Sequence, residues 1–230
     1  MRRSRAVRGS RRAPELDIHA VVASLEAACA AFRDPMVTEM TRTRRDPFAV
    51  LVATLLSLRT RDEQTREAAA RLFALASTPE EMVRLDVPTV ERAIFPVGFY
   101  RVKARRVLEV CRVLLHRYRG RVPEDLDELL TLPGVGRKTA NLVVTLGYGL
   151  PGICVDTHVH RISNRLGYVA TRTPEDTEMA LRKKLPPEYW IRYNDLLVSF
   201  GQNVCHPTSP WCSRCPLARW CPRMGVNRSR

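Results

Sequence analysis

The sequence predicts an all-α fold. No long stretch alternates apolar and polar residues with the period of two that a half-buried strand requires. Apolar residues spaced three and four apart instead recur from residue 16 to about residue 203, as in amphipathic helices. Several of these segments begin with Asp-Pro, Thr-Pro or Val-Pro, and proline is favoured in the first turn of a helix. The 230 residues suffice to bury a core as one large or two small domains.

Three helices are expected in the first third of the chain. Residues 16–32 carry a helical apolar stripe that ends before Asp34-Pro35. Asp46-Pro47 caps and opens a buried helix over residues 48–58, and residues 62–75 form an amphipathic helix. The run 48–58 is much shorter than the roughly 20 apolar residues that a membrane span needs. No transmembrane segment is therefore expected.

Four helices are expected in the middle of the chain. Two short ones open at Thr78-Pro79 and Val87-Pro88. A long helix runs over residues 100–118, where Gly120 closes it. A short helix covers residues 123–130, with Pro123 at its start and acidic residues in its first turn.

The last part of the sequence predicts four more helices. Residues 137–148 are apolar enough to form a largely buried helix. Val159, Ile162 and Leu166 have helical spacing after Asp156, which has the position of an N-cap. Thr173-Pro174 opens another helix with acids in its first turn, and a last helix covers about residues 188–203.

The charge of the chain predicts a polyanionic partner. The formal net charge is +14 and the sequence pI is about 10.2, a balance typical of nucleic-acid-binding proteins. Residues 1–13 hold six arginines and no acid, and the remainder is basic as well. We expect residues 1–15 to be a disordered arm that adds non-specific affinity through phosphate contacts. A short organelle transit peptide is the alternative, and because no secretory signal follows, a cytoplasmic protein is expected.

Lys138 is the candidate nucleophile. The chain has four lysines against 34 arginines, so a site that needed only positive charge would be expected to carry arginine. Arginine cannot lose its proton or form an imine, whereas lysine does both when its pKa is lowered.

The residues around Lys138 predict a hairpin between two helices. Leu132-Pro133-Gly134-Val135-Gly136 precedes Arg137-Lys138, and glycines there allow positive φ or close approach of the backbone to a ligand. Backbone N–H groups of such a turn at a helix N-terminus form an anion site. An ordinary glycine turn between core helices is the alternative. The full motif favours phosphate binding.

Asp156 is the second candidate for chemistry. Capping is the commonest use of aspartate at such a position, and a carboxylate there can also stabilise a developing cation. Lys138 begins one helix and Asp156 the next, so antiparallel packing would bring them together. His158 and His160 are two residues apart and would point away from each other on a helix, which disfavours a two-histidine metal site.

Four of the seven cysteines are grouped as candidate metal ligands. Cys29, Cys111 and Cys154 lie singly in apolar surroundings and are expected to pack as small hydrophobes. The others follow the pattern C-x6-C-x2-C-x5-C: Cys205, Cys212, Cys215 and Cys221. A disulfide pair is disfavoured in a reducing compartment. The compact, uneven spacing favours a [4Fe–4S] cluster, with zinc as the open alternative.

Three motifs together resemble the endonuclease III family of DNA glycosylases, in the helix-hairpin-helix superfamily. They are residues 132–140, residues 155–158 and the spacing of the four grouped cysteines, and the similarity runs from about residue 16 to about residue 222. The resemblance implies two helical domains with DNA in the cleft between them. A six-helix barrel with the hairpin would occupy residues 40–150, and residues 16–39 with 151–230 would carry the [4Fe–4S] cluster.

The resemblance also implies a reaction: bifunctional glycosylase and abasic-site lyase activity in base excision repair. A damaged, oxidised pyrimidine is flipped out of the duplex, and Lys138 attacks C1′ and forms a Schiff base. Asp156 stabilises the cationic sugar, and β-elimination cuts 3′ to the abasic site. The implied substrate is double-stranded DNA with damaged pyrimidines or abasic sites, and the implied protein is a monomer that acts at the nucleoid.

Several residues carry over as implied DNA contacts: Gly134, Val135, Gly136, Arg137, His158, Arg59 and Phe99. Two of them depart from the family pattern. Arg59 stands where members often have a glutamine that fills the gap left by the flipped base. Phe99 stands where a leucine often wedges the base stack; an aromatic wedge and a core phenylalanine are both open.

The residues leave two other functions open. One is a monofunctional glycosylase that uses Asp156 and water, against which Lys138 argues. The other is a non-catalytic DNA-binding module with the hairpin for phosphates and structural zinc on the cysteines.

Overall fold

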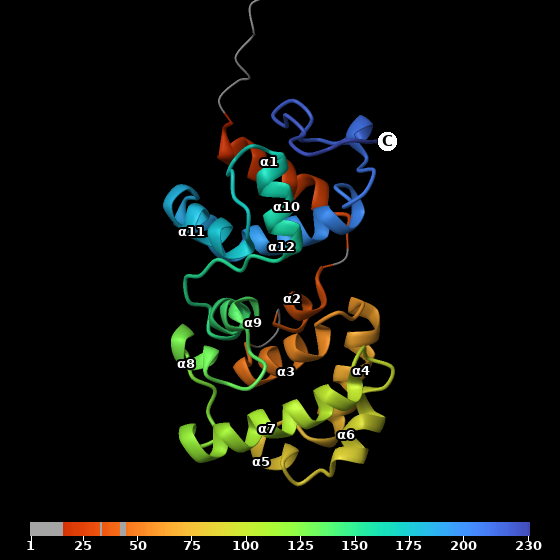
Figure 1. Ribbon diagram of the computed structural model, residues 1–230, viewed down its shortest axis with the longest axis vertical. Helices are drawn as coiled ribbons and strands as arrows, with labels where there is room; N and C mark the ends of the chain where they lie inside the picture. The colour runs from red at the N-terminus through yellow and green to blue at the C-terminus, as the bar shows by residue number, and fades with distance from the viewer. Residues whose placement is uncertain (1–15, 33, 42–44) are drawn as a thin grey trace, which may run out of the picture.

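A computed structural model describes residues 16–32, 34–41 and 45–230. Secondary structure in these ranges is helical, with no strand, so the all-α prediction is confirmed. The helices gather in two lobes, one above the other in the view of Figure 1. The arm expected at residues 1–15 lies outside the described residues.

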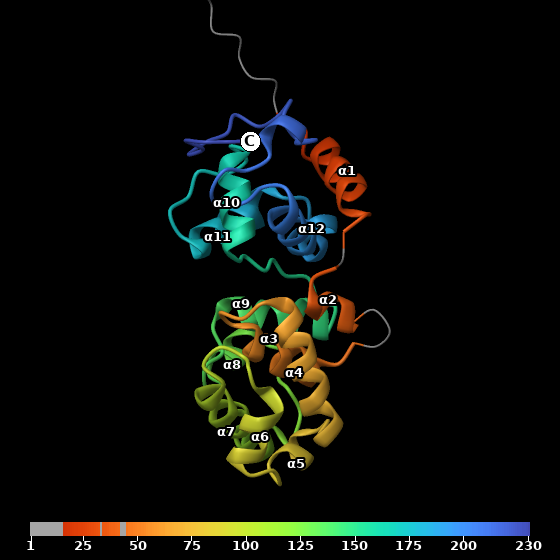
Figure 2. The same cartoon turned by 90° about the vertical axis from the view of Figure 1, so that its right-hand side faces the viewer.

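The lower lobe is built around α3 (Pro47–Ser57), which is buried along almost its whole length. A helix that is apolar on all sides needs neighbours on all sides. Here α3 packs against α4 (Asp62–Leu75), α7 (Tyr100–Tyr118) and α9 (Arg137–Leu142) and against the π-helical turn η1 (Val143–Gly147). The other helices of this lobe complete the shell in Figure 2: α2 (Met36–Thr41), α5 (Pro79–Met82), α6 (Val87–Ile94) and α8 (Leu126–Leu130).

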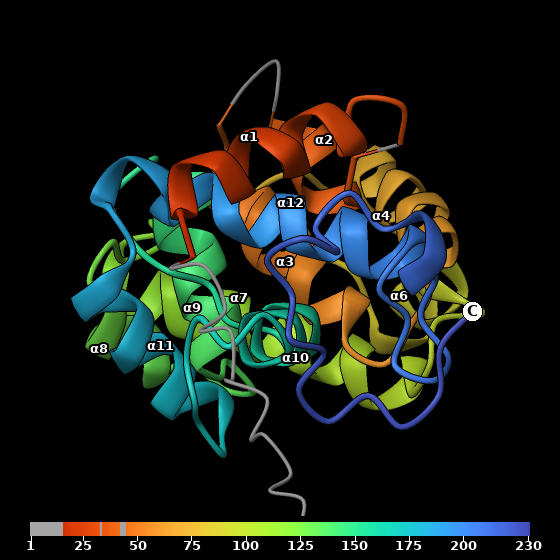
Figure 3. The same ribbon diagram turned by 90° about the horizontal axis from the view of Figure 1, so that it is seen from above.

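The upper lobe joins the two ends of the chain. Helix α1 (Ile18–Cys29) lies along α12 (Trp190–Asn203), as Figure 3 shows from above. The remaining elements are α10 (Thr157–Arg165), α11 (Pro174–Lys184), and the short turns η2 (Pro187–Tyr189) and η3 (Cys212–Arg214). The hydrophobic core of this lobe is separate from that of the lower lobe.

Most predicted helix starts are confirmed. They could be predicted from the sequence because each depends on hydrogen bonds between residues that are close in the chain. Asp46 accepts from the amides of Phe48 and Ala49, and Thr173 accepts from the amide of Asp176. Thr78 and Glu81 form a reciprocal capping box at the start of α5.

Three expectations for the helices need correction. Pro123 does not open a helix, because Asp125 caps α8 and the helix begins at Leu126. The helix expected over residues 137–148 turns into a π-helix at Val143, where the Thr145 hydroxyl donates to the Asn141 carbonyl. Helix α2, which carries no strong periodic signal, was not expected.

Candidate active site

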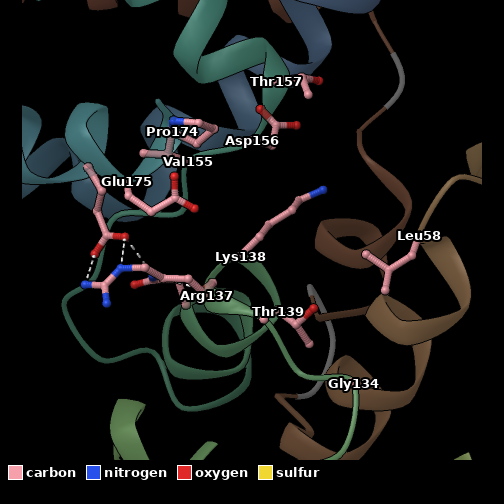
Figure 4. A pocket seen from close by; sticks show the side chains of 13 residues that line it. Leu58, Gly134, Arg137, Lys138, Thr139, Val155, Asp156, Thr157, Pro174 and Glu175 are labelled. Atoms are coloured by element: carbon pink, nitrogen blue, oxygen red, sulfur yellow. Dashed lines mark hydrogen bonds and ion pairs between the residues drawn. The ribbon is translucent and has the colours of Figure 1, made fainter. Parts of the chain in front are cut away.

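A pocket of about 440 Å³ lies where the hairpin of the lower lobe meets the upper lobe. Its walls come from the hairpin, the residues that enter α10, the start of α11, and Leu58 at the end of α3 (Figure 4). A second pocket, of about 220 Å³, shares Lys138, Asp156 and Thr157 with the first. The two candidate residues therefore stand on the boundary between two cavities.

Lys138 is the second residue of α9 and is half-buried. Its side chain extends from the hairpin toward the upper lobe, where Asp156 and Thr157 lie (Figure 4). The two residues line both pockets, so they lie near each other as expected. The expected antiparallel packing is not the reason, because α9 and α10 belong to different lobes and do not pack against each other as a pair. An amine in this position is open to a ligand and faces a carboxylate across the cavity.

Asp156 caps α10, as the sequence predicts. Its Oδ1 accepts from the backbone N–H groups of His158 and Val159, at 2.8 and 2.9 Å. In the described part of the chain Oδ2 has no hydrogen bond, although the residue is only 9% exposed. One oxygen therefore serves the helix, and the other remains for the pocket.

Two hydrogen bonds connect the backbone of Lys138, through Cys154, to Asn194 of α12. The Cys154 thiol donates to the carbonyl of Lys138 at 3.7 Å, and Asn194 Nδ2 donates to the carbonyl of Cys154 at 3.1 Å. Burial raises the pKa of Cys154, so this thiol stays protonated and is not a competing nucleophile.

His158 is neutral and its tautomer is set by a neighbour. Burial lowers its pKa, and Arg161 Nη2 lies 3.1 Å from its Nδ1. Because arginine only donates, Nδ1 accepts and the proton stays on Nε2. His160 is bonded elsewhere, to the Thr177 hydroxyl at 2.6 Å, so the two histidines do not converge.

The hairpin uses its two glycines differently. Gly134 has φ +72°, which favours glycine, whereas Gly136 is extended with open space where a Cβ would stand. The Val135 side chain is buried and its N–H donates to the Leu132 carbonyl at 3.1 Å. Within the hairpin, Gly136 thus leaves room for a ligand to approach its backbone, and Val135 mainly supports the turn.

Arg137, also expected at the DNA surface, has its guanidinium engaged inside the protein. It donates to both carboxylate oxygens of Glu178, at 2.7 and 3.0 Å, and Glu178 is buried. Arg182 and Asn141 donate to the same carboxylate. Two of the three guanidinium nitrogens, Nε and Nη2, are therefore engaged with a protein carboxylate.

Arg59 and Phe99 lie beside each other, which the sequence did not indicate. Both have left-handed backbone conformations, with φ of 54° and 59°. The Arg59 guanidinium lies over the Phe99 ring, 5.9 Å from its centroid. Because Phe99 is 63% exposed, the interpretation as a core phenylalanine is wrong.

The surroundings of the four grouped cysteines bear on their expected role as metal ligands. All are half-buried, and burial raises the pKa of Cys215 to about 11, with further repulsion from charge on the other three. Arg165 is buried beside them and donates to the sulfur of Cys205 at 3.3 Å. A metal–sulfur group would remove this repulsion, because cysteine binds a metal as the thiolate.

No single-ion arrangement is formed in the ranges that the structure describes: no three His, Cys, Asp or Glu side chains are placed to hold one ion. Of the other cysteines, Cys111 and Cys154 are buried as small hydrophobes, as expected, whereas Cys29 is half-buried.

None of the described helices is both long and apolar enough for a bilayer.

Sequence reasoning missed the polar residues that support the site. Glu178 and Arg182 have the i, i+4 spacing of a helix pair, which was a usable signal. Arg161 and Arg165, which bind carbonyls of the cysteine segment, and Lys103, which is buried in the lower lobe, gave no local signal.

Comparisons with known proteins agree with this geometry. Residues 52–187, more than half of the chain, match the family model "HhH-GPD superfamily base excision DNA repair protein". Endonuclease III of Thermotoga maritima is 51% identical over 176 residues, covering 76% of this chain and 83% of the relative.

Solved structures extend the similarity to the fold. One, described as a non-covalent endonuclease III–DNA complex, has a TM-score of 0.80 at 36% identity and covers 90% of this chain and 94% of its own. Another, a trapped endonuclease III–DNA covalent intermediate, has a TM-score of 0.79 at 35% identity, with the same two coverages. The chain belongs to the endonuclease III family of the HhH-GPD superfamily of DNA repair glycosylases.

Proposed function

We propose that the protein removes oxidised pyrimidines from duplex DNA, with Lys138 as nucleophile and Asp156 as the catalytic carboxylate. Membership of the family makes the chain a bifunctional DNA glycosylase and abasic-site lyase. The observation that carries the assignment of residues is the shared pocket, in which Lys138 faces Asp156 across a cavity at the junction of the lobes.

The glycosylase step exchanges one bond for another at the anomeric carbon. The neutral amine of Lys138 attacks C1′ of the extruded nucleotide while the C1′–N bond breaks. The base leaves with the bonding electron pair and takes up a proton. The Asp156 carboxylate stabilises positive charge on the sugar and accepts a proton from the attacking amine.

The lyase step follows from the amine that remains attached. The sugar ring opens as O4′ takes a proton and a C=N bond forms between C1′ and Nζ of Lys138. Loss of a C2′ proton then breaks the C3′–O bond, and the 3′ phosphate leaves. Because the C3′–O bond is the one that breaks, the cut lies 3′ to the lesion. Water then hydrolyses the imine and releases Lys138.

The substrate we propose is damaged duplex DNA, which the relatives' complexes support. The open backbone at Gly136 offers phosphates the first amides of α9. Arg59 and Phe99 would meet the base stack, and the Nε2 proton of His158 would face the backbone near the lesion. The protein would act as a monomer at the nucleoid.

We further propose that Cys205, Cys212, Cys215 and Cys221 hold a [4Fe–4S] cluster. With all four positions of the centre filled by thiolates, the cluster would supply structural stability and no reacting group. Residues 16–39 and 151–230 would then form the cluster domain, and residues 40–150 the barrel domain. The two separate hydrophobic cores support a division into two domains. At its edges, α2 packs on the barrel helices α3 and α4, and Cys154 belongs to the barrel core.

The test is a panel of duplexes that each carry one oxidised base, incubated with wild type and Lys138→Gln. Wild type should excise, nick and become trapped on DNA by borohydride. Lys138→Gln should bind with similar affinity but neither excise nor trap. Excision without trapping by the wild type would show a monofunctional enzyme, and equal cleavage by both proteins would refute the role of Lys138.

A further inference from the structure

Lys103 is a buried lysine that the proposed chemistry does not use. It lies in the first turn of α7 and is 8% exposed. Its ammonium donates to the carbonyls of Leu56 and Leu58, at 2.7 and 2.5 Å, and to the hydroxyl of Thr60 at 3.1 Å. In the described part of the chain no carboxylate forms an ion pair with it. Each of its three N–H groups therefore has a neutral oxygen partner.

These three acceptors explain why the residue is lysine in a chain with 34 arginines. They converge on one point at the C-terminal end of α3, where backbone carbonyls carry partial negative charge. A compact ammonium can donate in three directions from one atom. A guanidinium is planar and larger and presents its donors in a fork, so it cannot make the same set of bonds.

The same contact joins a second turn to the first. The Thr60 hydroxyl also accepts from the backbone N–H of Gly98, at 3.2 Å. A Cβ on Gly98 would stand 2.9 Å from the Arg59 carbonyl oxygen, so only glycine allows the two turns to touch here. Residues 58–61 and 95–99 are thus held as one unit, which we call the paired turns.

The paired turns form one edge of the candidate active site. The Leu58 side chain lines the larger pocket together with Lys138, and Thr60 lines the smaller one. Arg59 and Phe99 stack on each other at the exposed tips of the paired turns. Left-handed backbone is strained for both of these residues, so the conformation has to be held by neighbouring contacts.

We infer that Lys103 is a positioning residue that fixes the paired turns as a rigid edge against which duplex DNA is opened. This inference rests on the proposed function. Lys103 does not touch the reacting atoms. It sets where Leu58, Arg59 and Phe99 stand relative to Lys138, and this placement matters only for a base that must first leave the stack.

The experiment compares two substrates with wild type and Lys103→Met, a side chain of similar length without donors. The first substrate is a duplex with a paired oxidised pyrimidine, and the second is a single-stranded oligonucleotide with an abasic site, which needs no extrusion. We expect Lys103→Met to lose about 100-fold in single-turnover excision on the duplex. Borohydride trapping on the single strand should stay within about threefold of wild type.

Two further variants make the result specific. Lys183→Met removes an exposed lysine from α11 and should behave as wild type on both substrates. Thr60→Val removes one of the links and should show the same selective loss to a smaller degree, which gives a second test if Lys103→Met folds poorly. Hydrogen exchange at the Gly98 amide should be faster in both Lys103→Met and Thr60→Val than in wild type.

Equal losses on the two substrates, or no loss on the duplex, would overturn the inference. Unchanged exchange at Gly98 in Lys103→Met would overturn it as well, whatever the activity. If wild type itself neither excises nor traps, the proposed function fails, whereas the exchange at Gly98 still decides whether Lys103 holds the paired turns.

Discussion

Arg137 of α9 and Glu178 of α11 form a two-pronged ion pair between the lobes, with N···O distances of 2.7 and 3.0 Å. Glu178 is 2% exposed and also accepts from Arg182 at 2.9 Å. Because Arg137 precedes Lys138, this pair fixes the start of α9 against the upper lobe. The position of the candidate nucleophile therefore depends on a carboxylate that lies 40 residues further along the chain.

Glu178→Ala should destabilise the protein by about 2–3 kcal/mol, because two arginines lose a buried partner. The thermal midpoint should fall, and excision should fall with it as α9 loses its anchor. Asp176→Asn, in the first turn of the same helix and exposed, is the control and should change the midpoint little. A stable Glu178→Ala with full activity would contradict this role.

The two functions of Asp156 can be separated by substitution. Asp156→Asn keeps an oxygen for the His158 and Val159 amides but removes the charge, so the fold should hold while excision slows by about 100-fold or more. Asp156→Ala loses the cap as well and should cost about 1 kcal/mol of stability. Circular dichroism melts and single-turnover excision measure the two effects. An Asp156→Asn protein that unfolds would show that capping requires the charge.

Substitution of a grouped cysteine should affect the metal centre and the segment that it holds. Cys215→Ser should lose absorbance near 400 nm, typical of an iron–sulfur centre, and residues 204–221 should become sensitive to protease. Cys29→Ala, outside the group, should keep both properties. If wild type binds zinc and shows no such absorbance, the cluster assignment is wrong.

Asp195, whose Oδ1 accepts from the Thr38 hydroxyl at 2.7 Å, predicts a pH dependence of stability. This bond lowers the pKa of Asp195, but burial acts in the opposite direction and is the larger effect. Burial raises the pKa of Asp195 from 3.8 to about 6, with Asp34 adding repulsion. The folded state therefore binds the proton more tightly than the unfolded state. Protonation of Asp195 therefore stabilises the folded state. This contribution is fully present below pH 3.8 and is lost as the pH rises through about 6.

Asp195→Asn resembles the protonated form and should be more stable than wild type by about 1–2 kcal/mol at about pH 8. The difference should shrink toward about pH 5, as thermal midpoints across this range would show. Thr38→Val removes the hydroxyl and keeps the carboxylate, so it should be less stable than wild type at the higher pH. A difference that does not change with pH would argue against a raised pKa.

Local chemistry made much of the fold readable in the sequence. Asp46, Thr173 and Asp156 cap helices through amides two or three residues away, so the same few residues contain both partners of each bond. Lys138 stood out for a similar reason, since its residue type and the glycines beside it are neighbours in the chain. The pocket then placed Lys138 opposite Asp156, as their helix starts indicated.

The partners of Arg137, Arg59 and Lys103 were decided only by tertiary structure. The sequence predicts Arg137 as a phosphate contact, whereas in the structure its guanidinium binds Glu178 of α11. Arg59 meets Phe99, and Lys103 meets Thr60, because α3 and α7 bring two turns about 40 residues apart into contact. Such contacts depend on how whole helices pack, and no pattern within a few residues encodes them.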